Sequence, residues 1–248
     1  MDTFNTASDL RERGFHLLDP PVLILNYDPA GDGNDRDAII MVQREEWRRG
    51  ELHDPDLAIE YIFRILLAQR LPPDMEFPDK LAMMLGCEKQ MRRWKNQKRI
   101  SHYFVGVEQN GVGYAMASSM RTKTPGTVLG YTTVGNAKEK PFEEKHIAMP
   151  RLAALDNMRV LLEIHRVKVA KDCVGAKHLK SEMNSFVWKG PGRPEAMEGQ
   201  RDDLVMALCG ALWLGTKLIP PVNKQVKIDP KRGIKSHRAR QTGAIRIN

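Results

Sequence analysis

An apolar run that ends in an acid constrains the fold of this chain more than any other feature. Residues 22–27 form a continuous run of strand length, and Asp28 follows them directly. A strand without polar alternation is typical of a sheet that is covered on both faces. The turn-rich residues 28–35 and the apolar residues 38–42 then predict that a hairpin opens the sheet.

Further elements follow this hairpin in an alternating order. Apolar residues at helical spacing predict helices over 56–70, 79–96, 114–121, 150–165, 177–186 and 202–214. Shorter apolar runs predict strands over 102–107, 127–134 and 167–169. This order predicts an α/β fold with a mixed central sheet. We expect a leader or linker over 1–20, one domain over 21–217 and a basic tail over 218–248.

Composition narrows the class of protein. The chain has 248 residues, of which 42% are hydrophobic, as expected of a packed domain. It has neither an apolar run of about 18 residues nor an apolar signal core at its start, so neither a membrane span nor secretion is predicted. The three cysteines stand far apart, without zinc or disulfide spacing, which favours a reducing cytosol.

The positive charge gathers at the end of the chain. The formal net charge is +8, which suits a polyanionic partner. The tail has few large apolar residues, and we expect its basic side chains to bind phosphates or a protein partner unless it is a plain disordered terminus. The candidate DNA-binding residues are Lys224, Lys227, Lys231, Arg232, Lys235 and Arg238.

Three acidic positions share one kind of place in the predicted fold. Asp28 ends one strand, Glu108 ends another, and Asp202 and Asp203 open an apolar helix. Acids beyond strand ends can converge although they are distant in sequence. Converging carboxylates repel one another, and hard oxygen ligands favour Mg²⁺ or Mn²⁺. Two such ions, about 3.5–4 Å apart, suit phosphodiester hydrolysis without a protein nucleophile.

Each acid also has a structural interpretation. Asp28 is a candidate turn residue, Glu108 could simply flank a strand, and Asp202 or Asp203 is a candidate helix N-cap. Of the acids in the first turn, we expect Asp35 to help hold a metal ion and the others, Asp32 and Asp37, to be mostly solvated.

Three stretches resemble the nuclease domain of phage terminase large subunits: residues 27–39, 107–113 and 201–208. The resemblance spans 22 to about 216 and implies a ribonuclease H-like fold. It implies metal-dependent cutting of concatemeric viral double-stranded DNA during genome packaging, in the cytoplasm of an infected bacterial host. Carried over by position, Asp28, Glu108 and Asp203 would be catalytic metal ligands, with Asp202 as a helper.

The chain departs from this family in one respect. Full terminase subunits begin with an ATPase motor, and no G-x-x-x-x-G-K-[ST] motif occurs here. The resemblance therefore implies an excised or separately encoded nuclease domain, with the ATPase domain, the small terminase subunit and the portal as partners. The alternatives are a Holliday-junction resolvase, a ribonuclease H-type nuclease, or a non-catalytic module that binds DNA or the portal.

Overall fold

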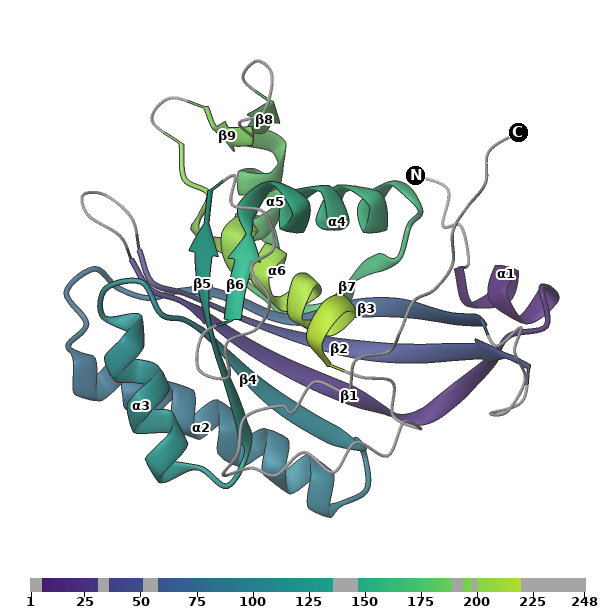
Figure 1. Cartoon of the computed structure of the whole chain (residues 1–248), viewed down its shortest axis with the longest axis horizontal. Coiled ribbons are helices and arrows are strands. Elements are labelled where there is room, and N and C mark those ends of the chain that lie inside the picture. Colours follow the sequence, from purple (N-terminus) through teal and green to yellow (C-terminus); the bar gives the residue numbers. More distant parts are fainter. Residues whose placement is uncertain are drawn as a thin grey trace.

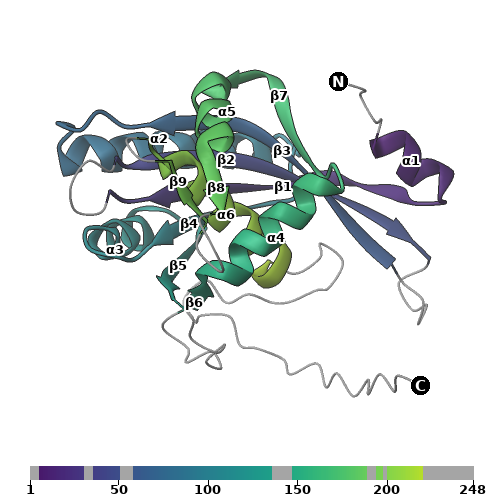
Figure 2. The ribbon, with the colours of Figure 1, turned by 90° about the horizontal axis from the view of Figure 1, so that it is seen from above.

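The computed structural model of the chain describes residues 6–30, 36–50, 58–135, 147–188, 194–197 and 200–219. In these ranges a seven-stranded sheet of order β6-β5-β4-β1-β2-β3-β7 lies between two layers of helices (Figure 1, Figure 2). Helices α2 and α3 cover one face, and α4, α5 and α6 cover the other.

The bounds of the elements follow the chain in order. The strands of the main sheet are β1 (His16–Asp28), β2 (Ala38–Arg49), β3 (Ala58–Arg70), β4 (His102–Glu108), β5 (Thr127–Val134), β6 (Ile147–Pro150) and β7 (Val167–Val174). The helices are α1 (Thr6–Glu12), α2 (Phe77–Asn96), α3 (Gly113–Lys123), α4 (Arg151–Glu163), α5 (Ala176–Ser185) and α6 (Asp203–Trp213). A separate two-stranded ribbon consists of β8 (Phe186–Trp188) and β9 (Pro194–Ala196).

The main sheet is mixed. Strands β1, β2 and β3 pair in antiparallel order, whereas β4 is parallel to β1 and β5 is parallel to β4. The prediction of an α/β fold with a mixed central sheet flanked by helices is confirmed. No helix among the described residues is long and apolar enough to cross a membrane.

The predicted first strand lies near the middle of this sheet. Successive side chains of a strand point to opposite faces. Val22 and Ile24 belong to the core beneath α4 and α6, whereas Leu23 and Leu25 belong to the core beneath α2 and α3. Because both faces of β1 are covered, its apolar run shows no alternation, and the prediction of a strand buried on both faces is confirmed.

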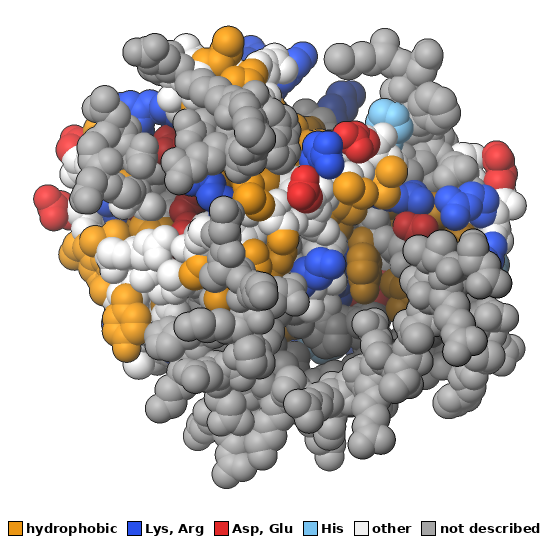
Figure 3. Space-filling view, turned by 45° about the horizontal axis from the view of Figure 1, so that its top comes forward, with side chains coloured by type: hydrophobic (Ala, Val, Ile, Leu, Met, Phe, Trp, Pro, Cys, Tyr) orange, Lys and Arg blue, Asp and Glu red, His pale blue; other side chains and the backbone are white. Residues whose placement is uncertain are grey.

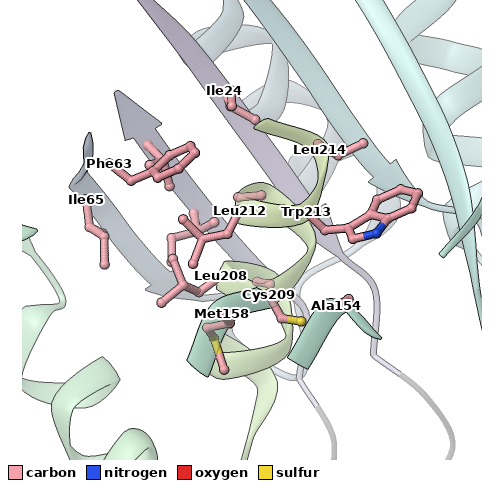
Figure 4. Packing of buried hydrophobic residues seen from close by; sticks show 14 of the residues in the cluster. Ile24, Phe63, Ile65, Ala154, Met158, Leu208, Cys209, Leu212, Trp213 and Leu214 are labelled. Carbon is pink, nitrogen blue, oxygen red and sulfur yellow. The ribbon is translucent and has the colours of Figure 1, made fainter. Parts of the chain in front are cut away.

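Helix α6 lies between the sheet and α4. Leu208 and Leu212 point toward Phe63 and Ile65 of β3, and Cys209 lies near α4 (Figure 4). Each leucine buried in this way contributes about 1.5–3 kcal/mol to stability. This packing explains why the sequence of α6 is apolar on nearly all sides. It also fixes the start of the helix, where the two candidate aspartates lie.

The helix predicted over residues 56–70 is wrong, because this segment forms strand β3. β3 pairs with β2 on one side and with β7 on the other. Phe63 and Ile65 enter one core, whereas Leu66 and Leu67 pack on the other. Register shifts at Met41/Val42 and Ile65/Leu67 break the two-residue alternation. The resulting apolar pattern imitates helical spacing.

Described elements lie at both predicted boundaries of the domain. Residues assigned to a leader form α1 and the beginning of β1, and Leu10 and Phe15 are buried against Trp47 and Ile62. At the other end, α6 continues as a π-helix over Leu214–Leu218. The folded part of the chain therefore extends into the predicted leader.

Candidate active site

Two candidate acids lie side by side because β1 and β4 run parallel. Tyr27 pairs with Val107, so the residues that end the two strands, Asp28 and Glu108, lie beside each other at the same edge of the sheet. The side chain of Glu108 is buried. Burial, and then the neighbouring Glu108 carboxyl group, raise the pKa of Asp28 well above its ordinary value.

The direction of Asp28 follows from a buried amide two residues earlier. Asn26 and Asp28 share a face of β1, since side chains alternate along a strand. The Nδ2 atom of Asn26 donates to the Tyr131 hydroxyl and to the Ala207 carbonyl of α6, both at 2.9 Å. This face of β1 is therefore turned toward α6. Sequence reasoning did not single out Asn26, although an amide inside an apolar strand was an available signal.

Asp203, the first residue of α6, lies beside one backbone amide and two guanidinium groups from three segments of the chain. Its side chain is 5% exposed, and its Oδ1 atom accepts a hydrogen bond from the Arg36 amide at 3.2 Å. Its Oδ2 atom lies 3.9 Å from Arg70 Nε and 3.8 Å from an Arg201 guanidinium nitrogen. The charge of Asp203 also contributes to the raised pKa of Asp28. The structure thus brings Asp203 into the electrostatic neighbourhood of the strand-end acids.

Asp202 lies at the edge of the same cluster. Its Oδ2 atom is 3.8 Å from an Arg151 guanidinium nitrogen, and its charge affects the pKa of Asp28 less than that of Asp203 does. Asp202 occupies the N-cap position of α6, but its side chain makes no capping hydrogen bond among the described residues. The amides of the first helical turn bond to Glu182 of α5 instead. Sequence reasoning missed Glu182.

A tight turn after β4 holds Glu108 in place. Asn110 Nδ2 donates to Glu108 Oε1 at 2.7 Å. Gly111 has a φ of +53°, and a Cβ atom on Gly113 would lie 1.7 Å from the Glu108 carbonyl oxygen. A side chain at Gly113 would therefore displace the strand end. The glycines serve a strand-to-helix turn, and Asn110 is an additional residue of the site.

Asp37 is not the solvated turn acid that the sequence suggested. It is buried at the start of β2, where it accepts hydrogen bonds from the Tyr27 hydroxyl at 2.7 Å and the Ala30 amide at 2.9 Å. Lys80 of α2 forms an ion pair with its other oxygen. The expectation was wrong because turn acids can cap the turn itself and pair with a helix packed beneath it. Asp37 closes the base of the hairpin.

The chemistry of the cluster fits a divalent cation. Asp28 and Glu108 offer hard oxygen donors in contact, and a cation would relieve the repulsion between them. Within the described ranges, no three His, Cys, Asp or Glu side chains stand close enough together to hold one ion. Mg²⁺ commonly binds through one or two protein carboxylates and keeps several waters. The Asp28–Glu108 pair is therefore the candidate site for a cation, with Asp203 as the next carboxylate.

Two other groups of candidates lie outside the described residues. These are Asp35 and the basic tail residues Lys224, Lys227, Lys231, Arg232, Lys235 and Arg238. On the face drawn in Figure 3, the described basic and acidic side chains are interspersed rather than gathered by sign. On this face, then, the described side chains form no broad basic patch.

Comparisons with known proteins bear on the fold. No protein-family model matches the chain, and no curated protein matches it in sequence. Solved structures similar to it include human cytomegalovirus terminase nuclease domains. An Mn-soaked, inhibitor-bound form has 16% identity over 79% of this chain and 84% of that chain, with a TM-score of 0.47. A second structure of this domain has 17% identity over 78% and 82% of the two chains, with a TM-score of 0.46.

At these values the likeness does not by itself assign an activity. The class of protein that follows from the chain's own geometry is an α/β domain with carboxylates at one edge of its mixed sheet. The similar structures are terminase nuclease domains, the class that the sequence motifs resemble, although from human cytomegalovirus rather than a phage.

Proposed function

We propose that this chain is a metal-dependent endodeoxyribonuclease whose active site is formed by Asp28, Glu108 and Asp203. The observation that carries the proposal is the parallel pairing of β1 and β4, which places Asp28 beside Glu108. Asp203 is near enough to raise the pKa of Asp28. Buried carboxylates that face one another destabilise a protein without a metal ion. Ionisable groups perturbed in this way are concentrated at functional sites.

The surrounding residues are suited to cleavage of a phosphodiester. Divalent cations bound by the cluster would supply Lewis-acid chemistry and an activated water. Asn110 orients Glu108, and the Arg36 amide orients Asp203. Arg151 and Arg201 border the acids with side chains that are 41% and 31% exposed. Partly exposed guanidinium groups at this place are suited to bind phosphates of the substrate backbone.

The biological substrate that we propose is concatemeric viral double-stranded DNA, cut during genome packaging. The support is the order of the three motifs, which resembles phage terminase large subunits. A terminase ATPase domain, the small terminase subunit and the portal are the proposed partners, in the cytoplasm of an infected bacterial host. Two Mg²⁺ or Mn²⁺ ions are the proposed cofactors.

Plasmid cleavage in Mn²⁺ tests the active site. Asp28→Asn and Glu108→Gln should each reduce the rate by at least about 10²-fold, because loss of a metal ligand removes several kcal/mol of transition-state stabilisation. Asp156→Ala is the matched control, since this acid is 53% exposed on α4 and pairs only with the neighbouring Arg159 in the described contacts. Equal cleavage by the wild type and Asp28→Asn would show that the catalytic assignment is wrong.

The choice of substrate separates the proposal from its alternatives. Linear duplex should be cut at least as fast as a four-way junction or an RNA–DNA hybrid. Faster cutting of the junction would indicate a resolvase, and faster cutting of the hybrid a ribonuclease H-type enzyme. Salt-sensitive DNA binding without any metal-dependent cleavage would indicate a non-catalytic binding module.

A further inference from the structure

A buried glutamate from α5 caps the helix that carries the active-site aspartates. The side chain of Glu182 is 2% exposed. Its Oε2 atom accepts hydrogen bonds from the amides of Leu204 at 2.7 Å and Val205 at 3.1 Å. The first amides of a helix have no partner within the helix, and an N-cap side chain usually supplies one. Here the acceptor comes from a different helix, about twenty residues earlier in the chain.

The other oxygen of Glu182 holds an arginine beside the site. Its Oε1 atom accepts a hydrogen bond from Arg70 Nε at 2.6 Å. The same oxygen also forms an ion pair with a terminal nitrogen of the Arg70 guanidinium group. The same Nε atom lies 3.9 Å from Asp203 Oδ2, beyond hydrogen-bonding distance. A single carboxylate thus joins α5, the start of α6 and the end of β3.

This arrangement determines where the two aspartates point. Asp202 and Asp203 occupy the N-cap and the first helical position, from which an acid ordinarily bonds to the amides of its own helix. Glu182 already accepts those hydrogen bonds. The carboxylate of Asp202 lies near Arg151 instead, and that of Asp203 accepts from the Arg36 amide at the edge where Asp28 lies. Among the described residues, the side chain of Asp202 makes no capping hydrogen bond to its own helix.

We propose that Glu182 is a positioning residue for metal binding, an inference that rests on the proposed nuclease function. By capping α6 and binding Arg70, it keeps Asp203 directed into the carboxylate cluster. Without Glu182, Asp202 or Asp203 would turn back to cap the helix, and Arg70 would pair closely with Asp203. Both changes reduce the negative charge that is offered to a cation.

The test is Mn²⁺ affinity of the metal-free full chain, measured by calorimetry without DNA. Glu182→Ala should weaken binding by about tenfold or more, as is typical when the residue behind a metal ligand is lost. The Mn²⁺ affinity of Glu182→Gln should lie between those of the wild type and Glu182→Ala. The amide oxygen of glutamine still accepts hydrogen bonds from the helix amides, but the uncharged amide does not neutralise Arg70.

Glu88 provides the matched control for a general loss of stability. It is also a buried helical glutamate, 3% exposed, and it accepts from the Tyr103 hydroxyl at 2.6 Å on the opposite side of the sheet. Glu88→Ala and Glu88→Gln should lower the unfolding temperature and leave Mn²⁺ affinity within about twofold, since only residues that hold a ligand change metal affinity strongly.

The outcomes separate this inference from the proposed function. If the wild type binds Mn²⁺ and Glu182→Gln binds it equally well, Glu182 is only a structural cap and the inference fails while the nuclease remains. The same conclusion follows if the Glu88 and Glu182 variants lose affinity alike. If the wild type binds no Mn²⁺ at all, both the inference and the proposed function are overturned. Should Glu182→Ala not fold, the glutamine variant decides.

Discussion

Replacing Asp28 by asparagine should stabilise the metal-free protein at neutral pH although it removes a proposed metal ligand. Burial, and then the contact with Glu108, raise the pKa of Asp28 in the folded state. A carboxyl group with a raised folded pKa binds its proton more tightly in the folded chain. Its ionisation therefore lowers stability as pH rises from the unfolded pKa through the folded one. An asparagine amide has no charge and can donate a hydrogen bond to Glu108.

The magnitude follows from the contact between the two acids. Two unit charges about 4 Å apart repel by about 4 kcal/mol at an effective dielectric of 20. The wild type avoids part of this repulsion by holding a proton on Asp28, and solvent at the half-buried carboxyl screens another part. We therefore expect a gain of about 1–3 kcal/mol for Asp28→Asn. In a domain of this size, that raises the unfolding temperature by about 2–10 °C.

Thermal unfolding in EDTA at several pH values provides the measurement. The gain of Asp28→Asn over the wild type should be largest at pH 8 and shrink as pH falls, because the wild-type carboxyl then takes up its proton. Mn²⁺ should stabilise the wild type more than the variant, since only the wild type has the full ligand pair. The reasoning is refuted if Asp28→Asn lowers the unfolding temperature at pH 8, or if its effect does not change with pH.

Three further substitutions test the packing at the site and away from it. Gly113→Ala should lower both the unfolding temperature and the cleavage rate, because its Cβ would lie 1.7 Å from the Glu108 carbonyl oxygen. At Gly86 nothing lies within 4 Å of an added Cβ atom, so Gly86→Ala should raise the free energy of unfolding by up to about 1 kcal/mol. A decrease would contradict the steric explanation given for Gly113. Arg44→Met should cost about 3–5 kcal/mol, because it breaks the buried ion pair with Glu46. The cleavage rate per folded molecule of this variant should be unchanged, because Arg44 lies about 20 Å along the sheet from the site. Plasmid assays on the soluble fraction measure this rate.

The parts of the fold that the sequence predicted correctly are those with one dominant pattern. The hairpin start, β4, β5 and the long amphipathic helices each show a single periodicity between clear turn signals. β3 was mistaken for a helix because both of its faces are buried and its register shifts. Its Ile59, Tyr61, Ile62 and Phe63 are residues favoured in strands. Weighing this composition above the spacing would have corrected the prediction.

The candidate acids were predictable because their positions are local properties of the sequence. An acid directly after an apolar run marks a strand end wherever the sheet is placed, and parallel pairing then brings Asp28 and Glu108 together. The environment of Asp37 was not predictable in this way. Its burial depends on Lys80 of α2, which packs beneath the hairpin. No local signal distinguishes such an acid from its solvated neighbours in the turn.

Glu182 shows why a residue that supports the proposed site is harder to read from sequence than the candidate ligands. A ligand must lie at the edge of the sheet, and strand and helix ends mark that edge in the sequence. A residue that caps α6 from α5 needs only the packing of two helices, and its own segment looks like any amphipathic helix. The useful signal is indirect: two adjacent acids open an apolar helix, and the helix needs only one N-cap. If neither acid caps the helix, a third residue must, and the structure identifies it as Glu182. When a helix begins with more acids than its own N-cap requires, the neighbouring helices should therefore be searched for the residue that caps that helix.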